Sequence, residues 1–117
     1  MIDVRSQYRV GALFIALSGL LHISALVLSG FAPSSFLLGG VGVLWLFVAV
    51  GLLRNMRWLA YLAFLLAMIG GIAALSGAWT AGPVPHWVYL GIATAHLGAV
   101  LALFVALWRP ALVEVTY

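Results

Sequence analysis

The stretch from His86 to Trp108, HWVYLGIATAHLGAVLALFVALW, contains no charged side chain. At a rise of 1.5 Å per residue, a helix of about 20 apolar residues crosses the hydrocarbon core of a bilayer. This segment therefore predicts a membrane-spanning helix. Its length and apolar character are the standard for the other stretches of the chain.

Three earlier stretches have the same length and character, at about 10–31, 36–53 and 58–77. The breaks between them, at 32–35, 54–57 and 78–85, contain prolines, arginines or both, and proline disfavours continued helix. Ser34 or Ser35 can cap the second helix by accepting a backbone N–H. The sequence predicts an all-α bundle of four transmembrane helices, formed by residues 1–117 as one domain.

The composition excludes most soluble classes. Hydrophobic residues make up 67% of the chain and charged residues 6%, with a mean hydropathy of +1.27. A soluble domain is about half apolar and a quarter charged. The chain has no cysteine, which excludes disulfides and thiolate metal sites, and its two acidic residues, Asp3 and Glu114, lie near the ends. A carboxylate proton relay within the membrane is therefore not expected.

The arginines predict the orientation. Arg5 and Arg9 precede the first stretch, Arg54 and Arg57 separate the second and third, and Arg109 follows the fourth. In a four-pass chain these three places share one side, and positive charge stays on the cytoplasmic side during insertion. We expect both termini in the cytoplasm, the protein in a bacterial inner membrane, and the arginines at lipid head groups. Because the arginines are scattered, nucleic acid is not expected as a partner.

Small residues recur at three- or four-residue spacing in the last two stretches, so each set follows one face of its helix. Such faces let membrane helices approach closely. The third stretch carries Ala60, Ala63, Ala67, Gly70, Gly71, Ala74 and Ala78, and the fourth carries Gly91, Ala95, Gly98, Ala102 and Ala106.

Two histidines lie inside the predicted spans at one depth. His22 and His96 are each about 14 Å from the same edge of the membrane, counting 1.5 Å per residue from Phe31 and His86. His86 itself falls at the boundary and is expected to be wetted. Ionisable groups inside a bilayer are costly and are candidates for function by default.

The same count brings other residues to the level of the histidines. Trp45 of the second stretch is deep for a residue type that prefers the interface, and Gly70 and Gly71 of the third reach a similar level. The sequence thus predicts a mid-membrane layer of His22, His96, Trp45, Gly70 and Gly71.

This layer has three interpretations. In the first it is an internal cluster, in which an imidazole nitrogen accepts the Trp45 indole N–H, and Ser18, Ser24, Thr94 or backbone carbonyls accept the imidazole N–H. In the second, His22 and His96 bind haem b or a chlorophyll-type pigment, because each has a small residue one turn before and after it. In the third, the histidines contact a partner or lipid.

Three functions follow. The first is an accessory, structural or assembly subunit of a larger membrane complex, without catalytic chemistry and without a cofactor. Its partners are membrane lipids and other subunits or further copies of the chain. The second is a haem or pigment protein using His22 and His96. The third is a small homo-oligomeric transporter or channel for an uncharged or hydrophobic substrate. The length and helix count resemble small multidrug exporters, but those use a glutamate in the first helix, which residues 10–31 lack.

Overall fold

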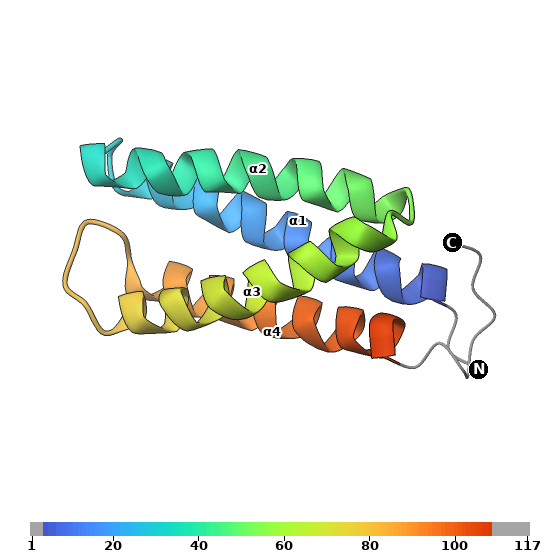
Figure 1. Cartoon of the computed structure of the whole chain (residues 1–117). Helices are drawn as coiled ribbons and strands as arrows, with labels where there is room; N and C mark the ends of the chain where they lie inside the picture. The colour runs from blue at the N-terminus through green and yellow to red at the C-terminus, as the bar shows by residue number, and fades with distance from the viewer. Residues whose placement is uncertain (1–3, 109–117) are drawn as a thin grey trace.

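The computed structural model describes residues 4–108, and within that range it is all-helical (Figure 1). Each of its four long helices is long and apolar enough to cross a membrane, which confirms the expected all-helical, four-helix architecture of the described residues. Asp3, Arg109 and Glu114 lie outside the described residues. The elements are α1 (Val4–Leu28), the short 3-10 helix η1 (Pro33–Ser35), α2 (Phe36–Leu53), α3 (Arg57–Ala78) and α4 (His86–Trp108).

Only α1 departs by more than one residue at either end from the bounds expected of it. It begins at Val4 rather than at position 10, because the helix continues through a polar segment that hydropathy does not count. It ends at Leu28, where Gly30 takes a left-handed φ of 68°. The Phe31 N–H then bonds to the Leu26 carbonyl at 3.0 Å, which closes the helix as a Schellman motif.

The start of α2 lacks the expected serine cap. Ser35 occupies the N-cap position, but its side chain makes no capping bond, and its Oγ is buried without a partner among the described residues. The reason is that Ser35 has helical dihedrals, with φ −92° and ψ −8°. A capping serine has extended dihedrals that aim its oxygen at the next backbone N–H groups. Ser34 is exposed.

The turn between α2 and α3 joins the two helices closely. Asn55 takes a left-handed φ of 59°, and the Met56 N–H bonds to the Gly51 carbonyl at 3.3 Å. A Cβ at Gly51 would overlap Leu59 Cδ2, so the absence of a side chain lets α3 begin against the end of α2. This turn fixes where α3 starts.

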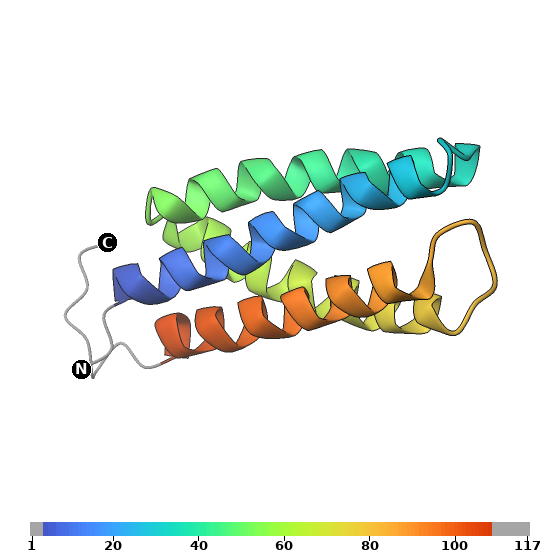
Figure 2. The ribbon, with the colours of Figure 1, turned by 180° about the vertical axis from the view of Figure 1, so that it is seen from behind.

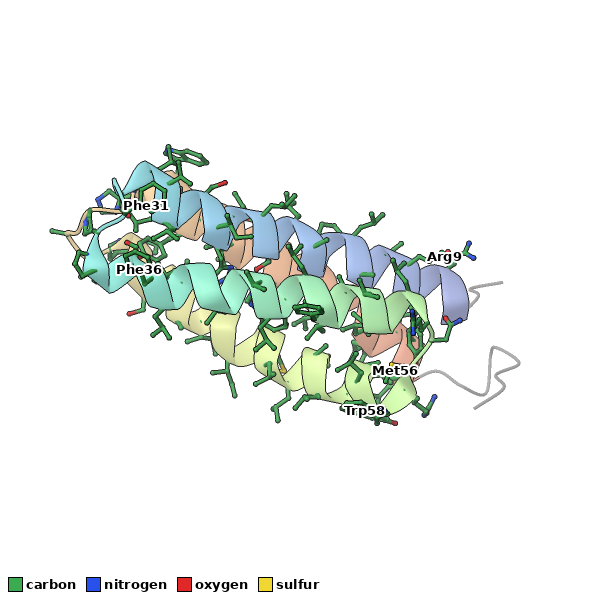
Figure 3. All side chains as sticks on the ribbon, turned by 90° about the horizontal axis from the view of Figure 1, so that it is seen from above. Arg9, Phe31, Phe36, Met56 and Trp58 are labelled. Carbon is green, nitrogen blue, oxygen red and sulfur yellow. The ribbon has the colours of Figure 1, made fainter. Side chains whose placement is uncertain are left out.

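The helices are arranged in the spatial order α2, α1, α4, α3 (Figures 1 and 2). Helix α1 packs along both α2 and α4, and α3 packs along α4, whereas α2 and α3 meet beside their turn and diverge from it. Arg9, Met56 and Trp58 lie at one end of the bundle, and Phe31 and Phe36 at the other (Figure 3). We call these the arginine end and the Phe31 end.

Two apolar clusters form the core, one toward each end. Between them lies a layer that contains polar side chains. Small side chains from the predicted faces of α3 and α4 line both clusters and the layer, as close helix packing requires. The buried members of those faces are Ala60, Ala63, Ala67 and Ala74 in α3, and Ala95, Ala102 and Ala106 in α4.

Candidate functional site: a polar layer inside the bundle

Four side chains from three helices meet beside the two apolar clusters, and one of them, Trp45, is itself a member of the first cluster. Ser18 and His22 come from α1, Trp45 from α2 and His96 from α4, and we call this group the polar layer. Their exposed fractions are 0%, 6%, 6% and 1% in that order. The imidazole centroids lie 6.0 Å apart with 26° between the ring planes, and the Trp45 ring meets His96 edge-on at 5.2 Å. The structure therefore brings together His22, Trp45 and His96.

Hydrogen bonds give the polar layer a direction. The His96 Nδ1–H donates to the Ala67 carbonyl of α3 at 3.1 Å, and the His22 Nδ1–H donates to the Ser18 carbonyl at 2.7 Å. Carbonyl oxygens only accept, so in the neutral rings both protons are on Nδ1. His96 Nε2 then accepts from the Ser18 hydroxyl at 2.6 Å. The series of bonds runs from His22 through Ser18 and His96 to Ala67 and links α1, α4 and α3.

Gly70 and Gly71 form the surface on which the His96 ring lies. A Cβ at Gly70 would come within 2.6 Å of His96 Cε1 and 2.9 Å of Nδ1, and one at Gly71 within 3.2 Å of His96 Cβ. Real Cβ atoms do not approach neighbours as closely as the first two distances. The two glycines therefore make the space for the imidazole, which explains why they share its level.

A second glycine contact positions His22. A Cβ at Gly42 of α2 would lie 2.6 Å from the Gly19 carbonyl oxygen and 2.8 Å from His22 Cβ, and one at Gly19 would lie 2.8 Å from the Gly42 oxygen. The backbones of α1 and α2 thus approach directly beside the polar layer. The spacing of small residues in the sequence does not reveal this pairing, because the pairing depends on how the two helices are aligned.

The Trp45 indole N–H takes no part in the hydrogen bonds of the polar layer. Its Nε1 is buried and has no hydrogen-bond partner among the described residues. The expectation that an imidazole nitrogen accepts this proton is wrong. Both Nδ1 atoms are donors, His96 Nε2 is occupied by Ser18, and the indole meets the His96 ring edge-on.

The other polar side chains considered from the sequence lie outside the polar layer. Ser24 and Thr94 donate to carbonyls of their own helices, at Leu20 and Leu90. His86 is exposed at the Phe31 end, where its ring bonds to the Ala78 carbonyl. Ser18 is thus the one of the three suggested hydroxyls that joins the histidines.

The arginines lie apart from the polar layer. Arg9 and Arg54 are exposed, and Arg57 Nη2 donates to the Tyr61 hydroxyl at 3.3 Å with its guanidinium 5.5 Å from that ring. Arg5 lies within α1. Such positions near helix ends suit contacts with lipid head groups. Arg109 belongs to the residues that are not described.

The hydrogen bonds limit what the histidines can ligate. Both His96 nitrogens are engaged, so of the two buried imidazoles only His22 has a nitrogen, Nε2, without a hydrogen bond to the described residues. A haem b held by both histidines would require the Ser18 to His96 bond to break. The described residues contain no group of three or more side chains suited to a metal ion.

A groove of about 430 Å³ lies between α3 and α4 beside the polar layer. Its lining is apolar apart from Thr94 and His96, and both of these already make the hydrogen bonds given above. An apolar chain fits such a surface better than a polar group.

Comparisons with models of protein families, with curated proteins and with solved structures found no match to this chain. The described residues form a four-helix bundle of apolar helices with an internal polar layer.

Proposed function

We propose that the protein is a small accessory or assembly subunit of a larger complex in a bacterial inner membrane, without catalytic chemistry of its own. Both termini face the cytoplasm in this proposal, because the described arginines gather at one end of the bundle. The observation that carries the proposal is the outward face of α2.

That face combines bulky apolar side chains with one glycine. Leu37, Val43, Leu44 and Phe47 are exposed, and Gly40 lies among them at helical spacing. Nothing lies within 4 Å of the position that a Gly40 Cβ would take. A small residue on an open membrane-helix face lets a second helix approach closely, as at other transmembrane contacts.

The polar layer supports the same role. Its hydrogen bonds connect three helices of this chain, so the histidines act as a spacer that fixes how the helices are aligned. Helices held in fixed alignment keep the outward face of α2 in one position, as binding to a partner requires. A haem b held by both histidines has less support, because His96 has no free nitrogen, and a pigment held by one of them could use only His22 Nε2.

The test is purification from native membranes in a mild detergent, followed by measurement of mass and of co-purifying proteins. We expect a complex larger than one chain, which the Gly40→Leu variant loses because the new side chain fills the approach to α2. That variant should fold normally, since the space at Gly40 is open.

Ala73→Leu is the matched control, because Ala73 is exposed on α3 and the change also adds bulk. The control should retain the complex. Migration of the wild-type chain as a single bundle without reproducible partners would contradict the proposal.

A further inference from the structure

The polar layer contains two hydrogen-bonding groups of opposite kind that the chain leaves unused. Trp45 Nε1 is a buried donor without a partner, and His22 Nε2 carries a lone pair because the ring proton is on Nδ1. Both side chains flank the same His96 ring, at centroid distances of 5.2 and 6.0 Å. Buried polar groups are paired in the great majority of cases, so an unpaired one calls for an explanation.

We propose that the polar layer binds a neutral, lipid-soluble molecule through a hydroxyl oxygen, which accepts from Trp45 Nε1 and donates to His22 Nε2. A hydroxyl is the smallest group that satisfies both atoms, because its oxygen accepts while its hydrogen donates. The two protein groups thus specify the chemistry of the ligand head.

The ligand is neutral because the surroundings provide no opposite charge. No Asp, Glu, Lys or Arg lies within residues 10–53 or 58–108, so nothing in the helix interiors would compensate a buried ion. An uncompensated charge in a low-dielectric interior is far more costly than a hydrogen-bonded hydroxyl.

The ligand comes from the bilayer rather than from water. The two apolar clusters cover the polar layer toward both ends of the bundle. Helices α2 and α3 meet beside their turn and diverge after it (Figure 1). His22 and Trp45 each keep 6% of their surface exposed. In this proposal, a molecule dissolved in the lipid reaches the polar layer at the exposed edges of these two side chains.

The test uses the full chain in lipid nanodiscs with ¹⁵N-labelled tryptophan and histidine, and two probes of equal chain length, 1-decanol and decane. We expect decanol to shift the Trp45 indole N–H and the His22 Nε2 signals saturably, and decane to leave them unchanged. The Trp45 signal is assigned by its absence in Trp45→Phe. Trp79, which is exposed near the Phe31 end, serves as the internal control for general effects on the membrane.

Each variant should weaken decanol binding about tenfold, the usual effect of losing one hydrogen bond. Trp45→Phe is read at the His22 signal, and His22→Leu at the Trp45 signal. Equal responses to decane and decanol would overturn the proposal. So would a Trp45 N–H that shows close contact with water and does not respond to decanol, since the occupant would then be a buried water.

Discussion

The side of the bundle where α1 packs on α2 and α4 and the outward face of α2 both contain glycine, but they differ in what lies opposite it. On the first side Gly19 and Gly42 bring two backbones into contact, and Ser18 bonds to His96 across helices. On the second, nothing lies within 4 Å of the position that a Gly40 Cβ would take. The difference teaches that a glycine of this bundle permits close packing only where another helix lies opposite it.

The largest expected effect is at Gly42. In Gly42→Ala the new Cβ would meet the Gly19 carbonyl oxygen and His22 Cβ, and a backbone contact cannot be relieved by a rotamer change. We expect a loss of about 3 kcal/mol in the free energy of unfolding, the upper range for overpacking. The measurement is equilibrium unfolding of the bundle in mixed micelles with increasing SDS.

Gly40→Ala, two positions earlier on α2, is the matched control. It should change the free energy of unfolding by less than about 1 kcal/mol, because its Cβ meets nothing and only intrinsic helix propensity changes. Equal losses in the two variants would show that the contrast between the two sides is wrong.

A smaller loss in the free energy of unfolding is expected for a substitution at Gly70. The Cβ of Gly70→Ala would overlap the His96 ring, which can move but only by giving up its bonds to Ser18 and Ala67. We expect a loss of about 2 kcal/mol together with a change in the His96 nitrogen chemical shifts.

Gly71→Ala is the comparison, because its Cβ would meet only His96 Cβ, at 3.2 Å. A displacement of a few tenths of an ångström accommodates that contact. If Gly71→Ala perturbed the His96 signals as strongly as Gly70→Ala, the ring would not lie on Gly70 as described.

The smallest effect is expected at Ser18. Ser18→Ala removes the bond to His96 Nε2, and interhelical hydrogen bonds of this kind in membranes contribute about 0.6 to 1.7 kcal/mol. The loss should be about 1 kcal/mol, accompanied by a shift of the His96 Nε2 signal toward that of an unbonded acceptor. Ser24→Ala should leave that signal unchanged, because Ser24 bonds only to Leu20 of its own helix.

Much of the fold could be predicted from the sequence, because membrane-spanning helices are defined locally by length and hydropathy. The expected bounds of α2 and α4 coincide with those observed. The start of α1 could not be found in this way, since its first turns are polar but continue the same helix. The absence of a capping bond from Ser35 could not be predicted either, because capping depends on the backbone dihedrals of that one residue.

The candidate site was predicted less completely. A count of residues from the helix ends placed His22, Trp45, Gly70 and His96 at one level, and the rings do meet. Counting gives depth but not rotation about the helix axis, so it did not select Ser18 over the other hydroxyls. The sequence also predicted a hydrogen bond from the Trp45 indole N–H to an imidazole nitrogen, and the structure does not contain this bond.

The sequence by itself determined four apolar helices, the arginines at their ends and the shared depth of the histidines, since each depends on residues close together in the chain. Only the tertiary structure decided that Ser18 joins the histidines, that Gly42 faces Gly19 and that Trp45 Nε1 is left without a partner. The physical reason is that hydrogen bonds and close contacts between helices depend on relative rotation and translation. Those are set by packing over the whole bundle.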